Sequence, residues 1–186
     1  VPEGLDADFT IQIDDAAANS SIVLSMAPSG TDPATEGTDY YDNTFAYSFD
    51  GINYTTVAEG EAIDIGEGNT TLYVKTDTVD DSFDEANETF DLTATLTSQG
   101  SDYSASGTAT IIDNDEPTIT VGDAEGVIQD IDVPEGTDAV FTVNIEDAAA
   151  NSSLTLSLAN GTAIDADYNE AYFEYSTDNG QNWTAV

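Results

Sequence analysis

The sequence contains two copies of one pattern, and this internal repeat limits the possible folds more than any other feature. Residues 1–4 (VPEG) recur as residues 133–136, and residues 14–21 (DDAAANSS) recur as residues 146–153 (EDAAANSS), at a constant offset of 132. A repeat of this length has the size of one domain. The chain is therefore expected to hold two related domains.

Each copy is expected to be incomplete. The first copy lacks the stretch that precedes the VPEG segment in the second, residues 117–132, and the second copy stops about halfway through the pattern. We therefore predict a first domain over residues 1–115 without its first strand, and the N-terminal half of a second domain over residues 116–186. A chain cut in this way resembles an excerpt from a longer protein.

The hydrophobic pattern predicts strands rather than helices. Apolar residues alternate with Thr, Ser or Asp, and clusters of Gly, Asp, Asn and Ser separate the alternating segments, as in strands with one buried face. In the first copy these segments are residues 9–13, 22–26, 45–49, 72–75, 90–96 and 105–112. The short DAAANSS segment lies between two of them and is interpreted as a turn. The sequence thus predicts an all-β fold of tandem antiparallel β-sandwiches.

Charge narrows the possible functions. The chain has 38 acidic residues and one basic residue, Lys75, which gives a formal net charge of -37, and it has neither His nor Cys. Such a chain is a poor partner for nucleic acids and anionic membranes, and it cannot carry Ser/His/Asp or Cys/His catalysis. Oxygen atoms are the available metal ligands, and they favour Ca²⁺ or Mg²⁺. We expect a calcium-binding protein that is not an enzyme.

Three groups of acidic residues are candidates for the cation site. In residues 77–88, six of twelve positions carry carboxylates, which repel by about 1 kcal/mol per pair at a few Å even in water. Asp113 and Asp115 point to the same side of an extended chain at the junction of the two copies. Glu3 and Asp39 each lie beside a turn. The alternative for each group is a solvated loop on a very acidic surface.

Together these segments resemble the Calx-beta domain, a module of sodium/calcium exchangers, integrin subunits and bacterial surface adhesins. The resemblance rests on VPEG before a strand, residues 39–40 (DY), the acidic loop that leads into residues 88–90 (ETF), and the closing residues 112–115 (IDND). It implies a seven-stranded immunoglobulin-like sandwich that binds calcium at the end near its C-terminal linker. The aromatic segment at residues 44–57 departs from the pattern, either as a strand extension or as a variation within the family.

The resemblance also implies a set of calcium ligands, most of them carboxylates and one a backbone carbonyl, that of Phe83. The implied ligands are Glu3, Asp39, Asp80, Asp81, Phe83, Glu85, Asp113 and Asp115 in the first copy, and Glu135 and Asp167 in the second. Glu88, which borders the next strand, is a weaker candidate.

The sequence therefore predicts a calcium-rigidified extender repeat of an extracellular adhesin or surface filament, whose partners are neighbouring repeats. The composition is typical of exported bacterial or archaeal proteins and also of cytosolic proteins of halophiles, so it does not decide between these two locations. Two other functions remain open. One is an adhesion module that binds surface glycans or proteins through aromatic residues near turns, such as Tyr40, Tyr54 and Trp183. The other is a calcium-sensing regulatory domain. Neither nucleic-acid binding nor membrane insertion is expected.

Overall fold

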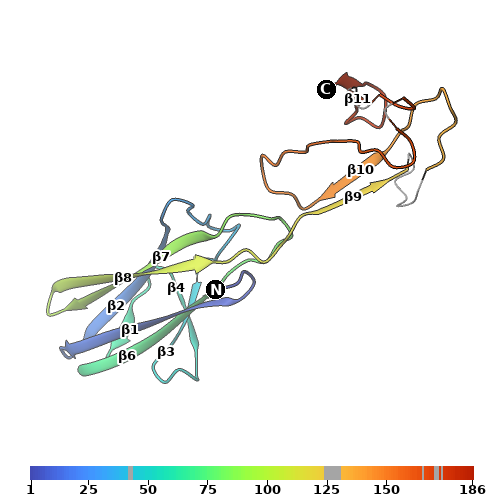
Figure 1. The fold of residues 1–186 in the computed structure, drawn as a ribbon. Coiled ribbons are helices and arrows are strands. Elements are labelled where there is room, and N and C mark those ends of the chain that lie inside the picture. The colour runs from blue at the N-terminus through green and yellow to red at the C-terminus, as the bar shows by residue number, and fades with distance from the viewer. Residues whose placement is uncertain (42–43, 124–130, 165, 170–171, 173) are drawn as a thin grey trace. The chain divides into compact units, whose positions relative to one another are not determined.

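The first part of the chain forms a sandwich of two antiparallel sheets (Figure 1). The computed structural model describes residues 1–41, 44–123, 131–164, 166–169, 172 and 174–186. Within these residues the regular elements are strands: β1 (Asp6–Ala16), β2 (Ser20–Pro28), β3 (Thr44–Ser48), β4 (Thr55–Ala58), β5 (Ile63–Ile65), β6 (Gly68–Asp77), β7 (Glu88–Ser98), β8 (Ser101–Ile111), β9 (Thr118–Gly122), β10 (Thr142–Glu146), β11 (Glu174–Tyr175) and β12 (Thr184–Ala185). The predicted all-β fold is confirmed.

Two four-stranded sheets make up the sandwich. The first has the order β1-β6-β3-β4 and the second has the order β5-β2-β7-β8, with antiparallel pairing throughout. Each predicted strand segment of the first copy falls in one of these strands, apart from Phe49 and Ile112, which lie just past the ends of β3 and β8. By its contacts the chain divides into two compact units, Val1–Ala150 and Asn151–Val186.

The DAAANSS segment, residues 15–21, contains the turn between β1 and β2: β1 ends at Ala16 and β2 begins at Ser20, so residues 17–19 form the connection. Asp15 and Asn19 have φ angles of 53° and 65°, and their counterparts Asp147 and Asn151 in the second copy have 58° and 68°. This left-handed region is costly for most residues but is tolerated by Asp and Asn, whose short polar side chains can hydrogen-bond locally. The repeated letters therefore give left-handed backbone positions at the same two places in both copies.

The aromatic segment at residues 44–57 forms a hairpin of β3 and β4. β3 pairs with β4 on one side and with β6 on the other, so the hairpin supplies two of the four strands of the first sheet. Asp50 orders its loop: Oδ1 accepts hydrogen bonds from the amides of Asn53 and Ile52, each at 2.8 Å, and Oδ2 accepts one from the side chain of Asn53 at 2.7 Å. The bonds from Asn53, followed by those from Ile52 and Ser48, lower the pKa of Asp50.

The second unit contains the counterpart of this hairpin, β11 and β12. Its loop has the same device, because Asp178 accepts hydrogen bonds from the side chain of Asn182 at 2.6 Å and from the amides of Asn182 and Gln181 at 2.8 Å and 3.0 Å. These bonds lower the pKa of Asp178 to about 2, with the side chain of Asn182 as the largest cause. One loop design thus serves both copies.

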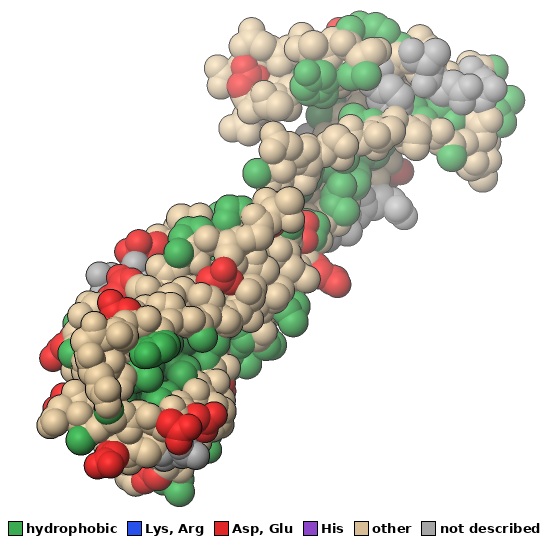
Figure 2. Space-filling model, turned by 90° about the vertical axis from the view of Figure 1, so that its left-hand side faces the viewer, with side chains coloured by type: hydrophobic (Ala, Val, Ile, Leu, Met, Phe, Trp, Pro, Cys, Tyr) green, Lys and Arg blue, Asp and Glu red, His purple; other side chains and the backbone are tan. Residues whose placement is uncertain are grey.

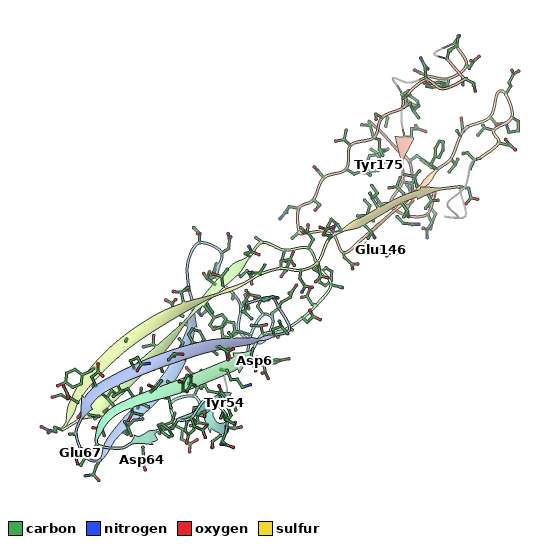
Figure 3. The ribbon with its side chains drawn as sticks, turned by 60° about the horizontal axis from the view of Figure 1, so that its bottom comes forward. Asp6, Tyr54, Asp64, Glu67, Glu146 and Tyr175 are labelled. Atoms are coloured by element: carbon green, nitrogen blue, oxygen red, sulfur yellow. The ribbon has the colours of Figure 1, made fainter. Side chains whose placement is uncertain are left out.

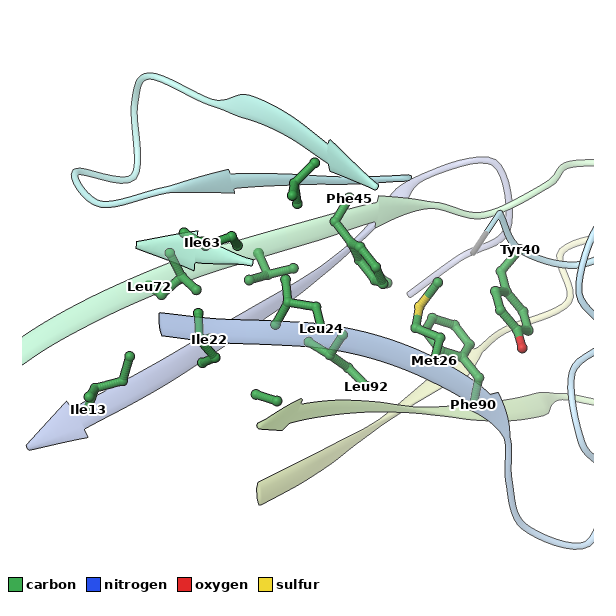
Figure 4. Packing of buried hydrophobic residues seen from close by; sticks show 14 of the residues in the cluster. Ile13, Ile22, Leu24, Met26, Tyr40, Phe45, Ile63, Leu72, Phe90 and Leu92 are labelled. Carbon is green, nitrogen blue, oxygen red and sulfur yellow. The ribbon is translucent and has the colours of Figure 1, made fainter. Parts of the chain in front are cut away.

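Large apolar side chains from both sheets fill the space between them (Figure 4). The ring of Tyr40 stacks on Phe90 with centroids 4.5 Å apart, and Phe9 meets Phe90 edge-on at 6.1 Å. Leu24, Leu72, Phe90 and the ring of Tyr40 are at most 1% exposed. Burying each such side chain contributes about 1.5–3 kcal/mol, which offsets part of the repulsion among the acids. Tyr40 is therefore a core residue and is not available to stack on a glycan.

Candidate metal centre

Segments distant in the sequence meet at one end of the sandwich. The amide of Glu3 donates to the carbonyl of Ile112 at 3.2 Å, and the amide of Ile112 donates to the carbonyl of Val1 at 2.7 Å. The amide of Val79 donates to the carbonyl of Asp39 at 3.0 Å. These backbone hydrogen bonds bring acidic residues from the chain before β1, before β3, before β7 and after β8 to the same end.

Glu3, Asp113 and Asp115 form the first cluster. One carboxylate oxygen from each lies within 4.8 Å of the other two, and all three side chains are partly buried. Asp113 Oδ1 and Asp115 Oδ2 are buried and accept no hydrogen bond from the described residues. Buried carboxylate oxygens are unfavourable without a partner. A cation held by these oxygens would supply that partner.

Asp39, Glu85 and Glu88 form the second cluster, again with carboxylate oxygens within 4.8 Å of one another. Asp39 closes the turn before Tyr40, where its Oδ2 accepts a hydrogen bond from the amide of Thr35 at 2.5 Å. Glu88 is the first residue of β7 and is partly buried. Glu85 of the loop and Glu88 of the strand therefore lie close to Asp39, which a separate turn holds in place.

The three glutamates of the clusters, Glu3, Glu85 and Glu88, have raised pKa values. Burial is the largest cause for Glu3, whose pKa rises to about 7 with help from the charges of Asp113 and Asp115. Burial followed by Asp39 raises the pKa of Glu88 to about 7, and burial followed by the charge of Asp81 raises that of Glu85. A bound divalent cation would reverse these shifts, because it stabilises the ionised form.

The two clusters are adjacent. A cavity of about 10 Å³ lies between them and is lined by Glu3, Asp39, Glu85, Ala86, Glu88, Ile111 and Asp113. This volume holds about one water-sized body. The end of the sandwich thus offers oxygen atoms from two clusters around a space that is too small for an organic ligand.

Two asparagines hold the cluster acids in place, although no sequence motif marks them as site residues. Asn114 donates to Glu3 Oε1 from its backbone amide at 3.2 Å and from its side chain at 3.1 Å, and the side chain also reaches Asp80 at 3.3 Å. The side-chain oxygen of Asn87 accepts a hydrogen bond from the amide of Asp113 at 3.1 Å. From the sequence alone, these two residues cannot be told apart from the many other Asn residues of the chain.

The other implied ligands of the first copy lie beside the clusters. Asp80 contacts the side chain of Asn114, and Asp81 Oδ1 accepts a hydrogen bond from the amide of Phe83 at 2.8 Å. The side chain of Phe83 is 55% exposed. Glu88, in contrast, joins a cluster as a full member. The sequence carried a signal for this, since Glu88 lies two residues before Phe90 and so points to the same side of the strand.

The implied ligands of the second copy do not belong to a cluster of three acids among the described residues. Glu135 is exposed in the first unit. Asp167 is exposed in the second unit, and its Oδ2 accepts a hydrogen bond from the amide of Ile164 at 3.0 Å, which resembles the turn closed by Asp39. The second copy therefore repeats the local turn without the acids of the loop and linker.

Acidic side chains also occur far from these clusters. Asp64 and Glu67 are exposed at the end of the first unit's sheets away from Asp6 (Figure 3). The register places β1 with Asp6 opposite Asp77 and Ala16 opposite Gly68, so Glu67 lies at the other end of β6 from the acidic loop. These two residues are natural controls for the effect of net charge alone.

Comparison of the sequence with models of known protein families and with curated proteins finds no match. The resemblance to Calx-beta domains therefore rests on the sequence segments that carry it. Within the part of the chain that the structure describes, no helix has the length and apolar character needed to cross a membrane.

Proposed function

We propose that this chain binds Ca²⁺ through its two carboxylate clusters and acts as a non-catalytic extender repeat of an extracellular adhesin or surface filament. The observation that carries the proposal is the pair of buried, unpartnered oxygens on Asp113 and Asp115 beside Glu3. The donor set is oxygen only, which suits a hard cation. Ca²⁺ fits better than Mg²⁺, because it accepts many oxygen ligands in irregular geometry while Mg²⁺ keeps much of its water.

The position of the first cluster suggests a mechanical role. Asp113 and Asp115 follow β8 directly and precede β9, with Pro117 between them and that strand. Glu3 belongs to the segment before β1. A cation shared by these acids would tie the connecting segment to the body of the repeat, and Pro117 removes one further backbone freedom. Without the cation the same acids repel one another and the connection is a hinge.

The expected energy is sufficient to matter. Extracellular calcium modules bind with dissociation constants of about 0.1–1 mM. At about 5 mM calcium, each site then stabilises the folded state by roughly 1 to 2.3 kcal/mol through mass action. Two sites would add a substantial share of the stability of an ordinary domain. The partners in this proposal are neighbouring repeats of the same chain or filament.

Calcium binding and stiffness can be measured on the same molecule. The chain has no Cys, so a double variant Ser101→Cys and Gln181→Cys, both at exposed positions, carries two spin labels specifically. Calorimetric titration of the calcium-free chain should show binding with dissociation constants of about 0.1–1 mM. The distribution of distances between the two labels should narrow when calcium is added, and it should narrow less when Mg²⁺ is added at the same concentration. An absence of binding, or an equal width with and without calcium, would refute the proposal.

A further inference from the structure

The second copy of the pattern contacts the first copy at a place outside the connecting segment. The backbone amide of Asp84 donates a hydrogen bond to the carbonyl of Asp147 at 3.0 Å. The hydroxyl of Ser82 donates to Asp147 Oδ1 at a longer distance of 3.4 Å. Ser82 and Asp84 lie in the acidic loop between β6 and β7, whereas Asp147 directly follows β10. All three residues belong to the compact unit Val1–Ala150.

Strand pairing explains why Asp147 lies beside the connecting segment. β9 begins at Thr118, directly after Pro117, and Thr118 pairs with Glu146 at the end of β10. The chain therefore leaves the connecting segment along β9 and returns to it along β10. Asp147 is the first residue after this return.

The acidic loop also contacts the connecting segment itself. The side chain of Asn114 donates a hydrogen bond to Asp80 Oδ1 at 3.3 Å. The loop is thus bonded to the connecting segment at Asn114 and to the turn of the second copy at Asp147. A connection that is held at one point allows its flanking parts to move, and a second point of attachment restrains that movement.

Burial differs between the two copies at the contacting residue. Asp147 is partly buried, whereas its counterpart in the first copy, Asp15, is exposed. Both residues have left-handed backbone, with φ angles of 58° and 53°, so the local conformation does not cause the difference. Asp84 is also partly buried, although its neighbours Phe83 and Glu85 are exposed. The two residues that the amide hydrogen bond joins are therefore both shielded from solvent.

The groups that bind Asp147 carry no charge. Acidic side chains are spread over the visible face of the first unit (Figure 2), and the acidic loop carries several, among them Asp81 and Glu85. A further carboxylate beside this loop is repelled by them. The hydroxyl of Ser82 and the amide of Asp84 are hydrogen-bond donors, so they offset this repulsion at the point of contact.

We propose that the turn after β10, residues 147–151, is a docking element by which the second copy binds the acidic loop of the first, with Asp147 as the anchoring residue. The partner surface is residues 82–84. The contact itself does not depend on the cation sites. Its role as a second attachment that stiffens the connection rests on the proposed function.

Paramagnetic labelling tests the contact directly. The chain has no Cys, so Ala150→Cys carries a spin label at an exposed position close to Asp147. In a chelator, this label should strongly broaden the NMR signals of the backbone amides of residues 82–84. The matched control is Ala18→Cys, the equivalent exposed position of the first copy, which lies at the end of β1 away from the acidic loop and should leave these signals unchanged. Sharp loop signals with the Ala150 label, or equal broadening by both labels, would overturn the proposal.

A pair of substitutions tests the anchoring role of Asp147. Asp147→Ala removes the side-chain acceptor and disfavours the left-handed backbone that presents the carbonyl. In a chelator, hydrogen exchange of the Asp84 amide should therefore accelerate by about threefold or more. Asp15→Ala makes the same change in the turn of the first copy and should leave this exchange rate unaltered. Equal rates in the two variants would refute the anchoring role, whereas a failure of calcium binding would affect neither measurement.

Discussion

Replacing Asp113 and Asp115 together by Asn should stabilise the chain in a chelator and lose that advantage in calcium. Every pair of acids in the first cluster includes Asp113 or Asp115, so the double variant removes all three repulsive pairs. At separations of up to 4.8 Å, one pair of full charges costs about 1 kcal/mol at the dielectric constant of water.

Glu3 is only partly ionised near neutral pH, because its pKa rises to about 7. The two pairs that include Glu3 therefore count about half each, and the total gain is about 1 to 2 kcal/mol. For a chain of this size that gain raises the melting temperature by roughly 2 to 8 °C in chelator. In about 5 mM calcium the unmodified chain recovers roughly 1 to 2.3 kcal/mol at this site and the variant does not.

Differential scanning calorimetry at pH 7, in chelator and in calcium, measures both effects. The matched control is Asp64→Asn with Glu67→Gln, which removes the same number of charges from exposed positions at the other end of the sheets. The control should change the melting temperature equally in both conditions. If the Asp113 and Asp115 variant keeps its full advantage in calcium, or if the control behaves in the same way, bulk charge explains the effect and the site does not exist.

Two further predictions test the fold. Phe90→Ala should lower the stability by about 3–5 kcal/mol in chelator and in calcium alike, because Phe90 packs against Tyr40 and Phe9 in the core; chemical denaturation measures this, and a loss below 1 kcal/mol would contradict the packing. Asp50→Ala should destabilise the β3–β4 hairpin at neutral pH. Because hydrogen bonds from Asn53 lower the folded-state pKa of Asp50, its contribution is present above the unfolded-state value of about 4 and disappears as the pH falls through the folded-state pKa. The difference between variant and unmodified chain should therefore shrink in acid, and a difference that grows below pH 4 would refute this role.

The strands and turns of the sandwich could be predicted because their signals are local. The alternation around Phe9 and Ile13 reports one buried face, and the left-handed positions Asp15 and Asn19 fall on residue types that tolerate them. The clusters could be predicted only in part, since their members are brought together by long-range pairing. Asn114 illustrates the limit: its two hydrogen bonds to Glu3 span 111 positions in the sequence.

The hairpin at residues 44–57 could not be assigned from sequence for a related reason. Its strands alternate as any strand would, and only the pairing of β3 with β6 shows that it extends the first sheet. The role of Glu88 depended on a boundary. The sequence pattern predicts that the strand begins at Phe90, whereas β7 begins two residues earlier, at Glu88. This difference decides whether the carboxylate of Glu88 belongs to a strand or to a solvated loop.

The chain has a net charge of -37, yet most positions on the outer face of β7 and β8 carry no charge. The outer face of β7 and β8 carries hydroxyl pairs instead, such as Thr93 with Ser106 and Thr95 with Ser104, each 2.8 Å apart. The carboxylate of Asp91, on the same strands, accepts a hydrogen bond from the hydroxyl of Thr108 at 2.6 Å. This face therefore adds little to the repulsion among the acids.

Like charges concentrate where the loops and the connecting segment meet. Glu3 and Asp113 come from opposite ends of the first copy, and their mutual repulsion opposes the backbone hydrogen bond that joins Glu3 to Ile112. Removing a cation would then loosen this end while the hydrophobic core, with Phe90 and Leu24 fully buried, stays intact. Under the proposed function, calcium therefore changes the stiffness of the connection between repeats and leaves the fold of each repeat intact. A chain of extender repeats requires this, because each repeat must stay folded whether or not calcium is bound.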